Sequence, residues 1–404
     1  MSAASPAAPG TLRNDATIIS LVGFAHGTSH FYHFVLPPLF PYLMAQFGLS
    51  FTQAGALMTV FFAVSGVGQA LAGFVVDRVG ALRVLFGGIA LLACSGLVLA
   101  SANSYVWLMA AAAVAGLGNS VFHPADFTLL NRRVSTSRLG HAFSVHGLSG
   151  SLGWAAAPVF VLALAEMWGW RVAALGASVV GCAALAVLFF NRGRLADAPL
   201  PVEGPRPNGG SFAFLGAGVV WMCFLFFLLT VMAFGGLQNF APPVLERTYG
   251  ITFAVATTAL TAYLLGSAAG IATGGFFASK GDNQDRLVAV TLGFAAICAL
   301  LLASGWLPAW SAVTVMALMG FGVGFAGPSR DILVRRAATS TFGAGAFGRI
   351  YGFVYSGIDV GLAIAPIAFG LLMDAGRFTQ VLWGVAALQV LAIAAALLVG
   401  SRSR

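Results

Sequence analysis

The sequence has few charged residues. Asp, Glu, Lys and Arg make up 8% of its 404 residues, whereas these types are about a quarter of an ordinary soluble protein. Twelve acidic and twenty basic side chains are too few to coat a folded domain of this size with hydrated charge. A lipid-exposed surface needs no such coat. The composition therefore excludes a soluble globular protein and predicts an all-α polytopic membrane protein.

Cysteine is also scarce, and several motifs are missing. The four cysteines stand singly within apolar stretches and form no C-x-x-C pair, which argues against a disulfide framework and against a thiolate metal site. The chain has no G-x-x-x-x-G-K-[ST] loop for ATP and no H-E-x-x-H zinc motif. We therefore expect neither an enzyme nor a bound cofactor.

Long apolar runs dominate the rest of the sequence. A membrane-spanning helix needs about 20 mostly apolar residues, and twelve such runs follow one another along the chain. They lie near residues 16–47, 51–76, 83–101, 105–131, 140–165, 169–190, 213–245, 251–278, 287–304, 309–334, 346–372 and 379–400. The N-terminal tail lacks the compact basic-then-apolar design of a cleaved signal peptide, so we expect the first span to be retained.

A segment rich in Pro, Gly and Arg, residues 191–212, separates the sixth run from the seventh. It predicts a cytoplasmic linker between a six-helix bundle at 16–190 and a second six-helix bundle at 213–400. Short cytoplasmic tails, 1–15 and 401–404, flank the two bundles.

The basic residues predict the orientation, because cytoplasmic loops retain Lys and Arg. With the N-terminus placed inside, sixteen basic residues fall in cytoplasmic segments, and three fall in external loops, namely Arg171, Arg247 and Arg377. We therefore expect both termini in the cytoplasm. The net charge of +8 then follows from membrane topology, and nucleic-acid binding is not expected.

The two halves of the sequence repeat each other. The matched pairs are Pro37-Pro38 with Pro242-Pro243, Gly73 with Gly275, Pro124 with Pro328, and Pro158 with Pro366. All four offsets lie between 202 and 208 residues. Such a duplication is the usual construction of secondary transporters, whose binding site lies between the repeats.

The segment after the second span carries a motif. Gly73-Phe-Val-Val-Asp77-Arg78-Val-Gly80-Ala-Leu-Arg83 resembles the signature loop between the second and third helices of the major facilitator superfamily. The resemblance implies twelve transmembrane helices in two pseudo-symmetric bundles. It also implies that this motif acts as a cytoplasmic gate, which controls exchange between inward-open and outward-open states through charge and helix-dipole contacts.

A second resemblance, within that superfamily, is to the fosmidomycin-resistance group of bacterial efflux proteins. Gly118-Asn-Ser-Val-Phe-His123-Pro124 in the fourth span is similar to that group. The chain departs from it at His30, where an acidic residue is expected, and at Ala125, where Glu is expected. The resemblance implies an antiporter of the bacterial cytoplasmic membrane that exports a small polar or anionic compound or drug.

Three histidines lie on one face of the first span. His26, His30 and His33 are spaced by four and three residues, which stacks them along one helix stripe. Imidazoles change charge near neutral pH, so the stripe could relay protons or bind an anionic group. Hydrogen bonding to neighbouring helices is the alternative role. We expect no metal there, because no Cys, Asp or Glu accompanies the stripe.

The fourth and fifth spans add three ionisable candidates. His123 and Asp126 are three residues apart and share a helix face, so they can couple for proton transfer or form a structural ion pair at the cytoplasmic gate. His146 on the fifth span either faces the same cavity or caps a close helix contact.

In the second half, Arg330, Asp331 and Asp359 are the charges well inside the spans. The planar fork of Arg330 suits a carboxylate or phosphonate, so we predict that it contacts an anion. A gate salt bridge from Arg330 to Asp126 or Asp359 is the alternative. Asp359 lies nearer to the middle of the membrane and is the better carboxylate for proton coupling.

Uncharged polar residues complete the predicted pathway. Gln238 and Asn239 precede the proline pair of the seventh span and align with the His33 region of the repeat. Tyr351 and Tyr355 are one turn apart on the eleventh span and either line the site or pack in the interior.

These observations predict a secondary active transporter that works by alternating access and is driven by the proton gradient. Export of a small polar or anionic compound is the leading hypothesis, and import of an organic acid is the runner-up. From another class, an intramembrane histidine-based metal-binding protein is the alternative, whereas no feature favours a receptor without flux. The expected partners are a small-molecule substrate, protons and membrane lipid, and the expected state is a monomer.

Overall fold

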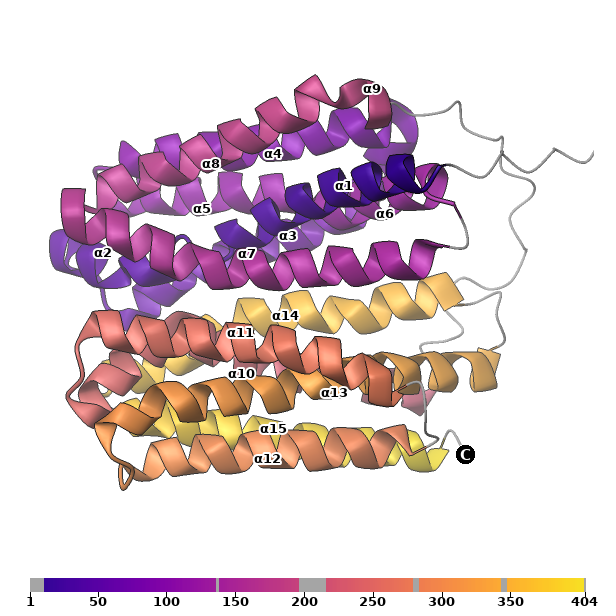
Figure 1. Cartoon of the computed structure of the whole chain (residues 1–404). Helices are drawn as coiled ribbons and strands as arrows, with labels where there is room; N and C mark the ends of the chain where they lie inside the picture. Colours follow the sequence, from indigo (N-terminus) through magenta and orange to yellow (C-terminus); the bar gives the residue numbers. More distant parts are fainter. Residues whose placement is uncertain (1–10, 136–137, 196–215, 279–282, 343–346, 403–404) are drawn as a thin grey trace, which may run out of the picture.

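The structure is a computed structural model that describes residues 11–135, 138–195, 216–278, 283–342 and 347–402 (Figure 1). The first half of the chain forms α1 (Leu12–Tyr32), η1 (Pro37–Leu39), α2 (Phe40–Phe47), α3 (Phe51–Val79), α4 (Ala81–Ala100), α5 (Tyr105–Asn119), α6 (Phe122–Arg133), α7 (Leu139–Trp168), α8 (Trp170–Phe190) and α9 (Arg192–Leu195). The second half forms α10 (Gly218–Tyr249), α11 (Phe253–Ala278), α12 (Gln284–Ser304), η4 (Ala309–Ser311), α13 (Ala312–Phe342), α14 (Phe347–Asp374) and α15 (Phe378–Arg402).

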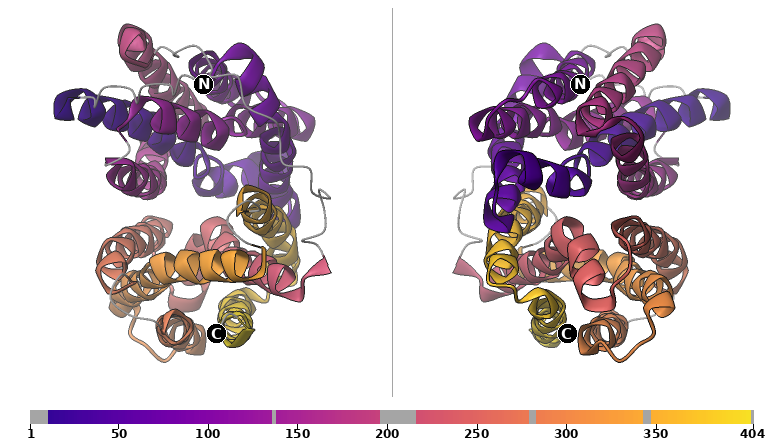
Figure 2. Two further views of the ribbon diagram at one scale, coloured as in Figure 1. Left: turned by 90° about the vertical axis from the view of Figure 1, so that its right-hand side faces the viewer. Right: turned by 90° about the vertical axis from the view of Figure 1, so that its left-hand side faces the viewer.

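The helices form two bundles. Figure 2 views them end-on and shows the first half of the chain as one group above the second half. Within the described residues, eleven segments have the length and apolar composition of a membrane span. The remaining predicted span, 16–47, is the broken segment α1–η1–α2. The predicted all-α fold, with membrane helices in two six-helix bundles, is therefore confirmed.

Prolines interrupt the first bundle at places where the second bundle is continuous. Pro37 has no N–H to donate to the carbonyl of His33, and α1 ends just before that residue. Pro124 likewise has no N–H for the carbonyl of Ser120, and the fourth predicted span is divided there into α5 and α6. By contrast, α10 and α13 continue through their prolines. The two breaks place His33 and His123 at helix ends.

Matched glycines let matched helices approach closely in the two bundles. A Cβ atom at Gly153 of α7 would collide with the carbonyl oxygen of Gly27 in α1. At the corresponding position of α14, a Cβ atom on Gly361 would lie 2.8 Å from the carbonyl oxygen of Leu228 in α10. Small residues of this kind allow membrane helices to pack backbone against backbone. The repeat in the sequence is thus a repeat of helix packing.

Hydrogen bonds join the two bundles near the end predicted to be external. Asp374, the last residue of α14, accepts hydrogen bonds from the backbone N–H groups of Phe51 (2.6 Å) and Thr52 (2.9 Å) at the start of α3. One to two turns further along, Thr59 Oγ1 donates to the carbonyl oxygen of Ala363 at 2.7 Å. These bonds join α3 of the first bundle to α14 of the second and close that side of the molecule.

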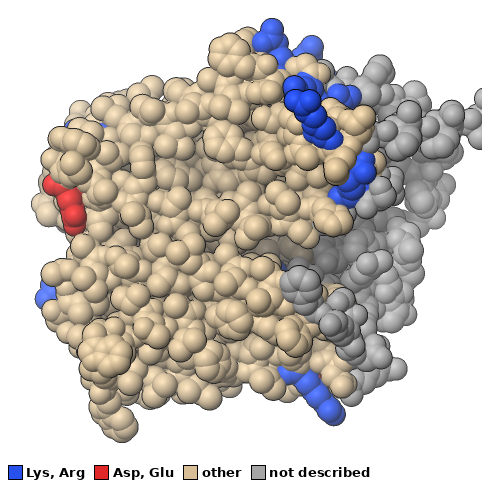
Figure 3. Space-filling model, in the orientation of Figure 1, with Lys and Arg blue, Asp and Glu red and all other residues tan. Residues whose placement is uncertain are grey.

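Charge is unequal at the two ends of the helices. On the face that Figure 3 shows, most Lys and Arg side chains lie at the end where α1 begins and α15 finishes, and the acidic side chains lie at the opposite end. The long lateral surface between them is almost free of charge on this face. A band of this kind fits a hydrocarbon environment.

A buried carboxylate joins two segments at the basic end. Asp15, just ahead of the predicted first span, accepts hydrogen bonds from the backbone N–H (3.1 Å) and the hydroxyl of Ser135 and from Arg138 Nε at 2.8 Å. Burial acts to raise the pKa of Asp15, but these donors outweigh it and hold the pKa below its ordinary value. The stability from this contact is present above the ordinary carboxyl pKa and is lost as the pH falls through the lowered value.

Candidate functional site

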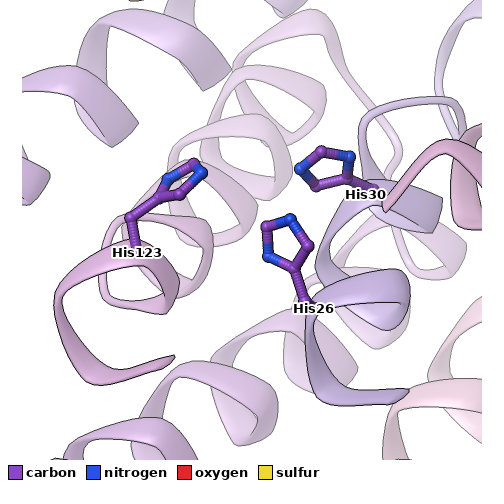
Figure 4. A group of neighbouring side chains, drawn as sticks. All are labelled: His26, His30 and His123. Atoms are coloured by element: carbon purple, nitrogen blue, oxygen red, sulfur yellow. The ribbon is translucent and has the colours of Figure 1, made fainter. Parts of the chain in front are cut away.

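Histidines from three helices meet inside the first bundle. On α1 the ring centroids of His26 and His30 lie 4.2 Å apart, and those of His30 and His33 lie 4.9 Å apart, in line with their predicted spacing. His123 of α6 lies 5.4 Å from His26, and His146 of α7 stacks on His26 at 3.5 Å. Figure 4 shows the rings of His26, His30 and His123 turned toward one another. Five of the six histidines therefore form one group, which we call the histidine cluster.

The histidine cluster encloses a carboxylate. Asp126 is fully buried, and its Oδ2 lies 3.1 Å from His146 Nε2 and 3.3 Å from His26 Nδ1. The expectation that no carboxylate accompanies the histidines of α1 is therefore wrong, because α6 packs Asp126 against them. Asp126 pairs with these two rings and not with His123, its predicted partner on the same helix. Asp126 Oδ1 and His26 Nδ1 lack hydrogen-bond partners within the described part of the chain.

His33 is held in one neutral form. Trp154 Nε1, which can only donate, donates to His33 Nδ1 at 3.1 Å. The proton of the ring must then lie on Nε2, which donates to Asn119 Oδ1 at 3.0 Å. Asn119 Nδ2 in turn donates to Ser65 Oγ at 2.8 Å. Protonating His33 would break the bond from Trp154, so these contacts favour the neutral ring.

A glutamine connects the histidine cluster to the second bundle. His123 Nδ1 donates to Gln69 Oε1 on α3 at 2.9 Å, and Gln69 Nε2 lies 3.5 Å from Asp359 Oδ2 on α14. Asp359 packs against Gly66, where an added Cβ atom would lie 3.0 Å from the Cβ of Asp359. The polar path from Asp359 to His123 thus crosses the contact between the bundles.

Arg330 and Tyr355 lie in a separate place within the second bundle. The guanidinium of Arg330 lies 4.7 Å from the ring centroid of Phe227. The ring centroid of Tyr355 also lies 4.7 Å from that of Phe227. Among the described residues, Asp126 pairs with histidines and Asp359 with Gln69, so the predicted salt bridge from Arg330 to either carboxylate stays a prediction without support there. The arginine fork stacks on an aromatic ring at this point.

Gln238 reaches across the pseudo-symmetry axis of the molecule. Its Nε2 donates to the carbonyl oxygen of His33 at 2.8 Å, the same carbonyl that Pro37 leaves without a helical partner. Asn239 donates to the Gly235 carbonyl of its own helix at 2.7 Å. The predicted alignment of Gln238 with His33 is therefore a direct contact between equivalent positions of the two halves.

Comparison with known families and proteins places this geometry in context. The sequence profile of the Major Facilitator Superfamily matches residues 22–348. The chain belongs to this superfamily. It is 27% identical to the membrane sensor protein UhpC of Escherichia coli (strain K12), over 81% of this chain and 79% of that protein. It is 25% identical to the MFS-type transporter YfnC of Bacillus subtilis (98% and 97% covered) and 23% identical to the Fosmidomycin resistance protein of Escherichia coli (72% and 71% covered).

A solved structure agrees with the fold. The crystal structure of a bacterial homologue of the human lysosomal transporter Spinster, in an inward-facing and occupied conformation, superposes with a TM-score of 0.72 at 13% identity. The match covers 98% of this chain and 97% of the other. At this identity the likeness concerns the fold alone. Family and fold together identify a transport protein of the superfamily and not an enzyme.

The superfamily gate motif lies at the turn between α3 and α4. Gly80 joins the two helices with a φ of 95°, a left-handed conformation that glycine adopts without strain. Arg78 and Arg83 are exposed on either side of the turn. The side chain of Asp77 lies outside the described residues, as do those of two further candidates, Asp331 and Tyr351.

Sequence reasoning missed several residues that organise the site. Gln69, Asn119 and Trp154 each hold a histidine of the cluster in a defined orientation. An available signal was that Gln69 and Asn119 are uncharged polar residues inside long apolar runs, where each needs a partner. The pairing itself depends on which helices are neighbours, and the spacing within one helix does not reveal that.

Gly150 of α7 leaves room for the rings of His26 and His30, and we predict that a larger residue at this position damages the site. A Cβ atom there would lie 2.6 Å from His30 Nδ1 and 3.1 Å from His26 Cδ2, so Gly150→Ala must displace the rings. We expect the initial transport rate in vesicles to fall about tenfold or more, since polar sites tolerate little displacement. Gly147→Ala, one turn away with nothing within 4 Å of the added atom, is the matched control. Equal rates for the two variants at equal amounts of protein would contradict this role.

Proposed function

We propose that the protein is a proton-coupled secondary active transporter of a bacterial cytoplasmic membrane, with both termini in the cytoplasm, and that it exports a small polar or anionic compound. Its membership of a transporter superfamily and its many membrane spans are the basis. The basic end of the molecule, which carries the helix ends nearest to both termini, supports the orientation (Figure 3). The similarity to the Fosmidomycin resistance protein supports export.

The observation that carries proton coupling is the position of Asp359. It is a half-buried carboxylate of the second bundle, and it lies against α3 of the first bundle beside the neutral amide of Gln69. A partly desolvated carboxylate beside a neutral amide is costly, and taking up a proton removes that cost. Since α3 and α14 must move relative to each other when access alternates, the charge on Asp359 biases which side is open.

Two other functions are candidates. The similarity to UhpC, which is described as a membrane sensor, favours a sensor that binds a solute without net flux. Within transport, import of an organic acid is the runner-up, because one cycle runs in either direction according to the gradients.

A ligand screen followed by a flux measurement tests the proposal. Thermal unfolding of the purified protein is measured with fosmidomycin, citrate and tetraphenylphosphonium, at one mildly acidic and one mildly alkaline pH. A ligand of the native state raises the unfolding temperature by mass action. We expect one class to do so and to accumulate in inside-out vesicles when a proton gradient is imposed. Binding without any flux would instead support a sensor, and flux that ignores the gradient would overturn proton coupling.

A further inference from the structure

Three imidazole nitrogens of the histidine cluster converge. One nitrogen each from His26, His30 and His123 lies within 4.8 Å of the other two (Figure 4). Points so spaced fit within about 2.8 Å of a common centre, and a zinc–nitrogen bond is roughly 2.0–2.1 Å long. A shift of each ring by less than about 1 Å therefore lets all three bind one ion.

Neighbouring groups orient two of these rings for metal binding. The amide oxygen of Gln69 accepts from His123 Nδ1, so the proton of that ring is on Nδ1 and the lone pair is on Nε2. Asp126 Oδ2 lies 3.3 Å from His26 Nδ1 without a hydrogen bond between them, and its negative charge favours a proton on that nitrogen and a lone pair on the other. The bond from His123 to Gln69 is of the kind that metal-binding histidines usually make through their second nitrogen.

The third ring is held by stacking. His30 packs against His33, at 4.9 Å, and against Trp154, at 4.5 Å, with ring planes within about 25° of parallel in both pairs. Its Nδ1 is buried against Gly150 of α7, and the nitrogen that faces His26 and His123 in Figure 4 is the other one, Nε2.

The cluster offers a second triad, but its geometry is poorer. His26, Asp126 and His146 also lie within 4.8 Å of one another. The rings of His26 and His146 are stacked, however, at 3.5 Å with an angle of 22° between their planes. Nitrogen lone pairs lie in the ring plane, so two stacked rings cannot both point at one ion. This leaves Asp126 and His146 as supporting groups behind His26.

Charge and exposure favour a divalent transition-metal ion. Asp126 lies beside His26, and Asp359 lies beyond Gln69, the residue that contacts His123. The two carboxylates offset the double positive charge of such an ion. Imidazole suits zinc, cobalt and nickel, whereas calcium and magnesium prefer oxygen ligands. His26 is buried, His30 half-buried and His123 exposed, so the ion can reach the triad from one side. Three ligands leave a coordination position open, as in sites that exchange what they bind.

We propose that His26, His30 and His123 bind a divalent transition-metal ion such as Zn²⁺, and that this ion is a cargo of the transporter. The inference goes beyond the proposed function, whose solute is a small polar or anionic compound, and rests on it only for the proton-driven transport cycle. From the sequence, metal binding by these histidines was an alternative hypothesis. The structure adds a nearby carboxylate and rings of defined orientation, which the sequence alone did not show.

Cobalt binding tests the site directly. The full chain, purified in detergent without a histidine tag, is titrated with Co²⁺ and its visible absorption is recorded, because imidazole-bound Co²⁺ in a site of low coordination number absorbs strongly. We expect one Co²⁺ per chain, displaced by Zn²⁺. No saturable absorption at millimolar Co²⁺ would overturn the proposal without any need for a variant.

Variants assign the ligands. We expect His30→Ala and His123→Ala to weaken Co²⁺ binding about 100-fold, and Gln69→Leu, which keeps all three ligands, to weaken it about 10- to 100-fold. His141→Ala is the matched control, since His141 is the sixth histidine and is exposed outside the cluster. The unfolding temperature in metal-free buffer verifies that each variant folds. Equal binding by folded His123→Ala and His141→Ala would overturn the assignment.

Uptake of radioactive zinc tests whether the ion that binds the histidine cluster is also transported. In proteoliposomes we expect Zn²⁺ to move when a proton gradient is imposed. Co²⁺ binding in detergent without zinc flux would keep the site and overturn the ion as cargo. Failure of Co²⁺ to bind would leave the proposed proton-coupled transport of another solute intact, because that is measured with the organic compounds of the ligand screen.

Discussion

Asp359→Asn is expected to abolish proton-driven net transport while leaving exchange of solute across the membrane. The amide has nearly the same size as the carboxyl, so the contact with Gly66 and the approach of Gln69 are retained. It cannot take up a proton, so the state that needs a neutral group is available at every pH and the gradient no longer biases the cycle. Net uptake into inside-out vesicles should fall to background, about a factor of ten or more, whereas exchange should stay within about twofold.

The measurement uses the solute that stabilises the protein in the ligand screen, with and without an imposed gradient. Glu166→Gln is the control, because it removes an exposed carboxylate at the far end of α7. If Asp359→Asn keeps the pH dependence of the parent protein, Asp359 has no part in proton coupling.

The repeat in the sequence was enough to predict the arrangement of helices around the site. The matching of Pro37 with Pro242 aligned His33 with Gln238, and the structure joins these two residues by a hydrogen bond between the bundles. The spacing of His26, His30 and His33 predicted one stripe, and their rings do lie in a row along α1. The stripe depends on helical periodicity, which is a local property of the chain, and the alignment of the halves depends on an internal repeat.

Partners on different helices could not be predicted in the same way. Asp126 was assigned to His123, three residues away, yet its partners are on α1 and α7. His123 and Asp126 both lie on α6, but the spacing within one helix does not decide which groups of the neighbouring helices Asp126 meets. Gln69 contacts both His123 and Asp359, although Asp359 is 290 residues away from Gln69 in the sequence. No pattern within α3 indicates these contacts.

Arg330 has a contact that its charge did not indicate. Its position within a span favoured a substrate contact or an ion pair, and both predictions considered only the charge of the guanidinium. The structure places it over the ring of Phe227, where the flat face of the group is in contact with an aromatic surface. Sequence reasoning ranks residues by charge and overlooks the stacking that a planar cation also allows.

Asp374→Ala is expected to open the external side of the protein more often. In the parent protein this carboxylate accepts from two backbone N–H groups at the start of α3, and alanine has no acceptor that could join α14 to them. Hydrogen bonds to a charged group contribute about 1.5–3 kcal/mol when buried, but Asp374 is exposed, so we expect about 1.4 kcal/mol in total. That difference raises the ratio of outward-open to closed molecules about tenfold.

Labelling from outside measures this shift. Thr59→Cys, in a background without the four native cysteines, places a thiol at the contact with Ala363, which a membrane-impermeant reagent reaches only when α3 and α14 separate. Gln53→Ala is the control, because it weakens the capping box of α3 without touching α14. Faster labelling with Asp374→Ala but not with Gln53→Ala would show that the carboxylate holds the two bundles together. Equal labelling would mean that packing between α3 and α14 closes the external side and that the hydrogen bonds to Asp374 add nothing to it.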